Sequence, residues 1–145
     1  MKKLIIAILL VVGITHADTV KKKAIMGAVE KYECTIMYIM DVSSNEKKSL
    51  KSPQDIRLYV MKDKNIVISF LDKPDEKGRR KMSLSPTLIR KDQDAKTVQY
   101  QDKDGHLTIF ADKNIDGHSF LLQNTTLKGT KYAHMTNECK LVVKK

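Results

Sequence analysis

The sequence predicts an all-β domain, either a small antiparallel up-and-down β-barrel or a sandwich, with about eight strands. Short runs rich in β-branched and aromatic residues recur about every ten residues, which is typical of such folds. Asp-Gly pairs and other turn signals separate these runs, and two cysteines lie near the two ends of the series. A disulfide between these cysteines would join the first strand to the last.

Composition is consistent with one globular domain. The chain has 145 residues, of which 41% are apolar and 30% are charged, and its formal net charge is +10. This apolar content is too high for a disordered chain, and six Gly with three Pro exclude a collagen-like or low-complexity protein.

The first 17 residues have the layout of a secretory signal peptide. Lys2 and Lys3 precede an apolar run from residue 4 to residue 14, and Ala17 provides a small residue for cleavage before Asp18. The alternative is a permanent membrane anchor, but eleven residues span only about 16 Å as a helix, roughly half the hydrocarbon core. Cleavage would remove two lysines and leave 128 residues with a net charge of +8 and no later membrane span. We therefore expect a periplasmic or secreted bacterial protein.

Export would place the two cysteines in an oxidising compartment. Cys34 and Cys139 are the only cysteines, and an oxidising compartment favours one structural disulfide between them. A closed loop of roughly 100 residues corresponds to about 4.7 kcal/mol in the chain-entropy model. A redox or metal-binding pair is the alternative, but it lacks a C-x-x-C spacing.

The predicted β domain covers residues 32–145, after an N-terminal arm or short helix over 18–31. Its first strand runs from Tyr32 to Met40, and the polar segment 43–55 is predicted to be a loop because it also contains Pro53. Later strands are predicted at Ile56–Lys62, Ile66–Leu71, Arg79–Ser85, Leu88–Lys91, Lys96–Gln101, Leu107–Ala111, Ser119–Gln123, Tyr132–Met135 and Cys139–Val143. A tight hairpin is expected at 63–65, and a type I′ hairpin turn at Asp104-Gly105.

Three histidines are the candidates for metal chemistry. His106 and His118 each follow an Asp-Gly pair, and His134 precedes Met135, which could act as a soft ligand for copper. A solvated histidine at a turn exit explains the first two equally simply, and no spacing matches a known ligand pattern. We therefore predict no metal and no cofactor.

No catalytic motif is present in the sequence. It lacks G-x-S-x-G, H-E-x-x-H and a glycine-rich phosphate loop, and bonded cysteines would leave no thiol nucleophile. We predict a non-enzyme; a hydrolase would require convergent His and Asp side chains.

The positive charge is dispersed along the chain. Its densest groups are at 21–23, 47–51, 79–81 and 144–145, and they lack the interleaved aromatics of a nucleic-acid interface. For an exported protein the natural partners are anionic envelope polymers or lipid head groups, unless the charge merely solvates the surface.

Two short motifs resemble the family of small periplasmic inhibitors of c-type lysozyme. They are Tyr32-Glu33-Cys34, matching Y-x-C, and residues 137–141 (NECKL), matching N-x-C-x-L. The resemblance implies a compact antiparallel β-barrel closed by a disulfide between its ends. The family's inhibitory S-G-x-x-Y string is missing, and the nearest stretch, residues 116–120 (DGHSF), lacks its Ser and Tyr at the matching places. The family's inhibitory residues therefore do not carry over to this chain.

Two functions remain as hypotheses for an exported, non-enzymatic domain. The first is a binding or inhibitor-type protein that acts on an envelope or extracellular macromolecule, with a surface near His118, Phe120 and Tyr132. The second is a lipocalin-like carrier of a small apolar ligand or lipid inside the barrel. The sequence leaves the oligomeric state open.

Overall fold

The computed structural model describes residues 25–126, 129 and 131–145. The proposed signal peptide and the first part of the predicted arm lie outside these residues. Within them, no helix is long and apolar enough to cross a membrane.

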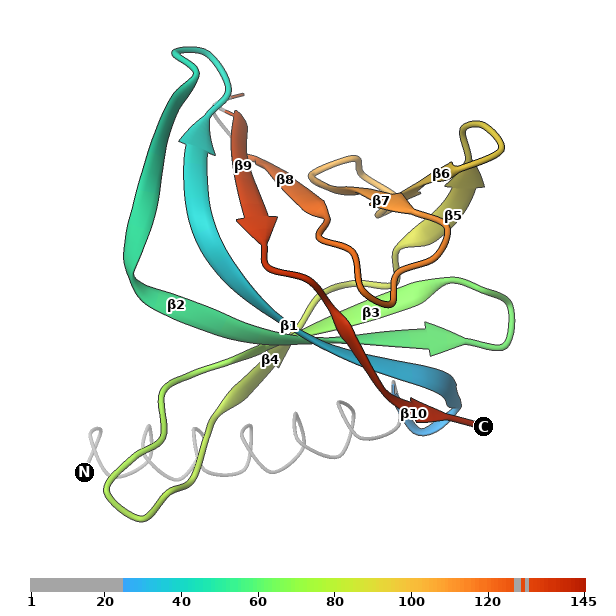
Figure 1. Ribbon diagram of the computed structural model, residues 1–145, viewed down its shortest axis with the longest axis horizontal. Helices are drawn as coiled ribbons and strands as arrows, with labels where there is room; N and C mark the ends of the chain where they lie inside the picture. The colour runs from blue at the N-terminus through green and yellow to red at the C-terminus, as the bar shows by residue number, and fades with distance from the viewer. Residues whose placement is uncertain (1–24, 127–128, 130) are drawn as a thin grey trace, which may run out of the picture.

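Ten antiparallel strands form one strongly curled, barrel-like sheet (Figure 1). The strands are β1 (Ala28–Asp41), β2 (Glu46–Met61), β3 (Ile66–Leu71), β4 (Met82–Leu84), β5 (Ile89–Asp92), β6 (Thr97–Gln101), β7 (Leu107–Asp112), β8 (Leu121–Thr125), β9 (Lys131–Thr136) and β10 (Lys140–Lys144). The predicted all-β antiparallel class is confirmed, and its barrel-like form replaces the sandwich alternative.

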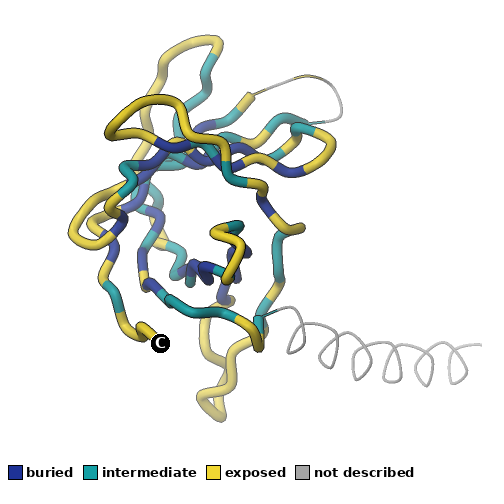
Figure 2. Tube along the Cα trace, turned by 90° about the vertical axis from the view of Figure 1, so that its right-hand side faces the viewer, coloured by how far each residue is buried: buried dark blue, intermediate teal, exposed yellow. Residues whose placement is uncertain are grey.

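The order in the sheet is β4-β3-β2-β1-β9-β8-β7-β6-β5, and β10 pairs with β1 beyond the end of β9. The two end strands, β4 and β5, follow each other in the chain. An isolated bridge between Ile66 and Leu88 links β3 to the segment that joins them. In the second view the trace curls round most of a circle (Figure 2).

The first strand begins earlier than the sequence predicted. Ala28 already pairs with Met61 of β2, so residues 28–31 belong to the sheet and not to an N-terminal arm.

The predicted loop over 43–55 is wrong for most of its length. β1 continues to Asp41, a short turn contains Asn45 with a φ of 56°, and β2 starts at Glu46. This half of β2 is polar because it is exposed, while pairing with β1 still satisfies its backbone. Pro53 lies where the β1–β2 register is irregular, so its missing N–H interrupts no regular ladder.

The turn at Asp104-Gly105 also differs from the prediction. Gly105 has a φ of 73°, whereas Asp104 does not have a positive φ, so the turn is not of type I′. The loop spans residues 103–106, closed by a hydrogen bond from Asp102 N to Leu107 O. The predicted hairpin at 63–65 is confirmed, with Lys64 N donating to Met61 O.

One continuous core fills the inside of the curled sheet. Alternate residues of β1, β2, β3, β6 and β7 point inward, as the two-residue period of a strand requires. The most deeply buried of these side chains are aliphatic: Ile36, Ile56, Leu58, Ile66, Ile68, Leu88, Val98 and Ile109. The opposite sides of these strands are only partly exposed, since Tyr59, Val67 and Ser69 of β2 and β3 are buried as well.

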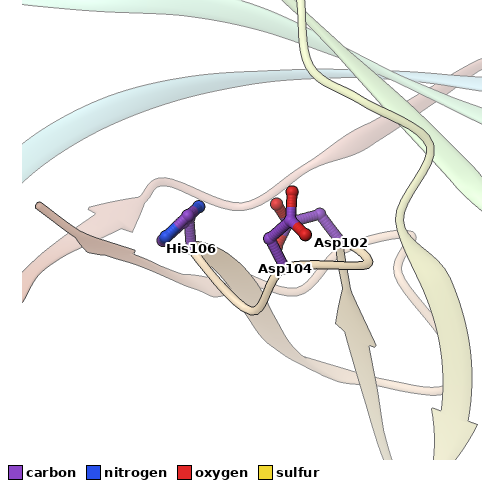
Figure 3. Close-up of side chains that lie close together, drawn as sticks. All are labelled: Asp102, Asp104 and His106. Carbon is purple, nitrogen blue, oxygen red and sulfur yellow. The ribbon is translucent and has the colours of Figure 1, made fainter. Parts of the chain in front are cut away.

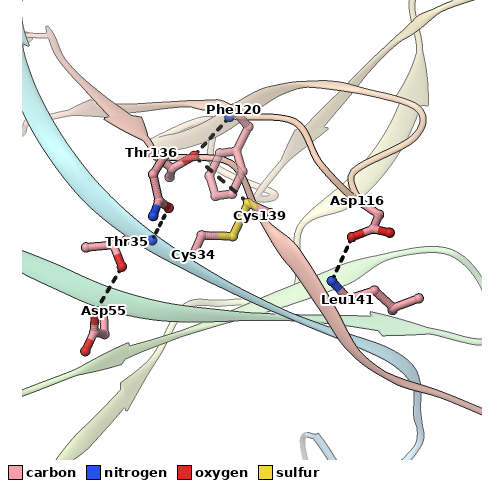
Figure 4. The surroundings of a disulfide bond; sticks show 9 residues. Cys34, Thr35, Asp55, Asp116, Phe120, Thr136, Cys139 and Leu141 are labelled. Atoms are coloured by element: carbon pink, nitrogen blue, oxygen red, sulfur yellow. Dashed lines mark hydrogen bonds between the residues drawn. A yellow bond between two sulfur atoms is a disulfide. The ribbon is translucent and has the colours of Figure 1, made fainter.

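The predicted disulfide is present and joins the first strand to the last. Cys34 of β1 and Cys139, just before β10, lie opposite each other with their Cα atoms 4.5 Å apart. Both are buried in the core cluster. Around the bond, Thr136 Oγ1 lies 4.0 Å from Cys139 Sγ and accepts a hydrogen bond from Phe120 N (Figure 4). The bond thus fixes the junction between β9 and β10 against β1.

Candidate binding face

A row of partly exposed apolar side chains crosses the outer side of four neighbouring strands. In β7, β8, β9 and β1, the residues Phe110, Leu121, Met135 and Tyr38 are direct cross-strand partners in that order. Ile109, Ala111 and Leu122, which flank Phe110 and Leu121, belong to the core, and cross-strand partners share one side of the sheet, so these four point away from the core. We call this row the outer apolar face.

Phe110 is the most exposed member of the outer apolar face. Its exposed fraction is 42%, whereas Leu121, Met135 and Tyr38 are partly buried. Each cross-strand contact shields part of its neighbours, which leaves a continuous apolar strip rather than isolated side chains. A contiguous strip of this kind differs from the scattered apolar residues of ordinary surfaces.

The neighbouring outer row is uncharged in its centre. It crosses β6, β7, β8, β9 and β1 through Gln101, Thr108, Gln123, Ala133 and Met40, of which Thr108 and Ala133 are buried. Gln101 Nε2 donates a hydrogen bond to Thr108 Oγ1, which satisfies both groups within the row. Two adjacent rows without a central charge are notable in a chain that is 30% charged.

A cavity of about 330 Å³ adjoins the outer apolar face. Phe110, Leu121 and Met135 line one part of it, and the rest is lined by residues from the ends of β6 and β7 and from the segment before β8. Its lining is mainly apolar, with a few polar groups such as Asp112. The outer apolar face is therefore hollowed at one end, where an inserted side chain could be buried.

A lysine defines the other end of the face. Lys47 of β2 places its Nζ 4.0 Å from the centre of the Tyr38 ring, a cation–π contact. This contact keeps the ring against the sheet and places a positive charge at the border of the apolar strip.

The surface predicted around His118, Phe120 and Tyr132 needs correction. Phe120 is only 4% exposed and belongs to the core, so it does not protrude as predicted. His118 is exposed in the loop before β8, with Nδ1 3.2 Å from the Asp116 carbonyl oxygen. Tyr132 is partly exposed on β9, on the opposite side of the strand from Met135. The row that forms the outer apolar face contains none of these three residues, although Phe120 lines the adjoining cavity.

The three histidines do not form a common ligand group in the described part of the chain. There, the one group with metal-ligand geometry combines His106 with Asp102 and Asp104, with ligand atoms within 4.8 Å of one another (Figure 3). Asp102 Oδ1 already accepts a hydrogen bond from Leu107 N, which shapes the β6–β7 turn. Turn formation therefore accounts for this group.

His134 lies apart from the other two histidines. Its cross-strand partner Leu122 points into the core, so the imidazole lies on the inner side of β9. Burial lowers the pKa of His134, although a backbone hydrogen bond at Leu122 opposes this shift. Its Nδ1 is buried without a hydrogen-bond partner.

Comparisons with known proteins give no match: no protein-family model, no curated protein and no solved structure is similar to this chain at a significant level.

The sequence did not reveal the outer apolar face, because its members come from positions 38, 110, 121 and 135. One available signal was the apolar character of both sides of the first strand, where Tyr38 and Met40 follow the core positions. That pattern indicates a second buried or binding side, but it does not identify the strands that complete it.

Proposed function

We propose that this protein is an exported, non-enzymatic binding or inhibitor-type protein whose outer apolar face holds a protein partner at the bacterial envelope or outside the cell. The observation that carries the proposal is the continuous row formed by Phe110, Leu121, Met135 and Tyr38. Aromatic residues and methionine are enriched in protein interfaces, while charges are depleted from interface centres. The disulfide is compatible with export.

The charge of the protein indicates the chemistry of the partner. The net charge is +10, or +8 after the predicted cleavage, and Lys47 lies at the border of the outer apolar face. A partner with an apolar side chain surrounded by acidic groups would match this arrangement. The apolar side chain would enter the cavity beside Phe110, and the acidic groups would meet the basic border.

The resemblance to inhibitors of c-type lysozyme supports an inhibitor-type role for a disulfide-closed β domain of this size. The missing S-G-x-x-Y string separates this chain from that family's mode of action. Our proposal therefore places recognition on the outer apolar face and does not include the lysozyme active site as the target.

Neither alternative function has a supporting feature of its own. A carrier would require room inside the sheet, but core side chains such as Leu58, Ile68 and Ile109 occupy its inner side. A hydrolase would require His and Asp to converge in a cleft, whereas His106 and Asp104 are exposed on a turn. Both alternatives are thus less well supported than binding at the outer face.

Comparative capture from envelope extract tests the proposal. The wild-type protein is compared with Phe110→Asp and with Val142→Asp, a control at an exposed valine of β10. We expect the wild type and the control to retain one acidic protein partner that Phe110→Asp loses, because a charge in the apolar strip must be desolvated on binding. The purified partner should then bind the wild type and the Val142→Asp control equally well, and Phe110→Asp more weakly. Equal binding by all three proteins would contradict the proposal.

A further inference from the structure

A second cavity, of about 300 Å³, lies beside the disulfide. Three parts of the chain enclose it: the paired strands β1 and β2, the β3–β4 hairpin, and the segment from β9 into β10. Cys34, Ile56 and Leu71 provide its apolar lining. We call this cavity the disulfide cleft.

Hydrogen bonds hold the walls of the disulfide cleft together. Asp55 accepts bonds from Thr35 Oγ1 (3.1 Å) and from Arg80 Nη1 (3.1 Å), while Arg80 Nε donates to the Asp72 carbonyl oxygen. Asn137 Oδ1 accepts a bond from Thr35 N at 2.8 Å. These bonds connect all three parts of the wall, and the Thr35–Asp55 bond is visible in Figure 4. The cleft is consequently built before any ligand arrives.

Arg57 is an incompletely paired cation of the cleft. Its Nε lies 3.6 Å from Glu33 Oε1, which is an ion pair but too long for a hydrogen bond. The same Nε is covered from solvent and has no hydrogen-bond partner. The guanidinium is therefore held against the sheet while its hydrogen-bonding capacity stays largely unused within the described structure.

The other charges of the cleft are exposed and of both signs. Lys140 is the cross-strand partner of Glu33, and Glu138 lies two residues before Lys140. Arg80 and Asp55 neutralise each other. What remains for a ligand is a guanidinium with a nearby ammonium, facing two carboxylates within one small cleft.

We propose that the disulfide cleft binds a small zwitterion, either a free amino acid or a dipeptide. The ligand carboxylate pairs with the Arg57 guanidinium, whose planar fork suits a carboxylate. The ligand ammonium lies toward Glu33 and Glu138. The balanced set of charges in the cleft disfavours a ligand with a net charge, because such a ligand would leave one sign unpaired.

An NMR titration of the full chain with L-alanyl-L-alanine tests this proposal. We expect saturable shifts at the amides of Thr35, Asp55 and Asn137. Two blocked probes, N-acetylated dialanine and C-amidated dialanine, each lack one of the two charges. Each should bind at least about tenfold more weakly than the free dipeptide, since a hydrogen bond to a charged group is lost. Equal binding of the free and blocked dipeptides by the wild-type protein would overturn the proposal.

Matched arginine variants locate the site. Arg57→Gln should weaken dialanine binding by about tenfold or more, whereas Arg79→Gln, on the exposed β3–β4 hairpin outside the cleft, should leave it unchanged. Phe110→Asp should also leave it unchanged, because the outer apolar face is a separate site. Absence of saturable shifts in the wild type, or equal weakening by Arg57→Gln and Arg79→Gln, would refute the cleft assignment without affecting the proposal for the outer face.

Discussion

At the scale of single residues, burial decides which aromatic and histidine side chains can reach a partner or solvent. Phe110 and Phe120 are ten residues apart, yet Phe120 belongs to the core and Phe110 is 42% exposed at the outer apolar face. His134 shows the cost of burial most directly, because its Nδ1 has no hydrogen-bond partner. A buried imidazole with an unpaired nitrogen favours the neutral form, which agrees with its lowered pKa.

This burial predicts that stability is lost as the pH falls below the ordinary histidine pKa of 6.5. Unfolded chains bind a proton at the ordinary histidine pKa of 6.5, whereas folded His134 binds it only at lower pH. The free energy of unfolding should therefore fall as the pH drops from 6.5 toward the folded pKa. In urea titrations, His134→Leu should show a smaller fall over this range than the wild type.

The exposed His118 provides the control for that measurement. His118→Leu should keep the wild-type pH dependence, because the His118 side chain is exposed in the loop before β8. Identical slopes for His134→Leu and the wild type would show that His134 titrates normally in the folded protein.

At the scale of elements, local turn chemistry and pairing between distant strands differ in how well they can be predicted. The hairpin at 63–65 and the alternating core positions of β6 and β7 follow from short-range patterns. The exposed half of β2 does not, because its backbone pairs with β1 although its side chains are polar. The outer apolar face also depends on register between strands that are far apart in the sequence, which no local pattern specifies.

The β2–β3 turn offers a test of its backbone geometry. Lys64 has a φ of 68°, a left-handed conformation that is costly for a residue with a Cβ atom. Lys64→Gly should raise the free energy of unfolding by about 0.5 kcal/mol, after the greater freedom of glycine in the unfolded chain offsets part of the gain. Urea unfolding measures this difference.

The neighbouring lysine is the matched control for that test. Lys62 lies in the same turn without a positive φ, so Lys62→Gly should lower stability by about 0.5 to 1 kcal/mol. A loss of stability in both variants would contradict the geometry assigned to Lys64.

At the scale of the whole molecule, the disulfide and the loop before β8 hold the last strand in place. Cys139 is bonded to Cys34, and Cys139 N also donates to the His118 carbonyl oxygen. Asp116 Oδ1 accepts a bond from Leu141 N at 2.9 Å, which covers part of the free edge of β10 (Figure 4). The two cysteines are 105 positions apart, so their bond constrains most of the chain. The sequence could predict this pairing because the chain has no other cysteines.

Removal of the disulfide should therefore destabilise the protein strongly. The double variant Cys34→Ala and Cys139→Ala should lose up to about 4.7 kcal/mol of unfolding free energy, the amount that the chain-entropy model gives for a closed loop of this length. Urea unfolding should show that reductant lowers the stability of the wild type but has no effect on the double variant. Equal stability of the oxidised and reduced wild type would contradict the structural role of the bond.

Site-specific photo-crosslinking in living cells would show whether the outer apolar face holds a protein partner, as we propose. A photoreactive phenylalanine analogue is placed at Phe110 in one protein and at Val142 of β10 in another. We predict one crosslinked partner from position 110, lost when Leu121→Asp is added, and no such product from position 142. Crosslinks of equal yield from both positions, or from position 110 only to a second copy of this chain, would contradict the claim.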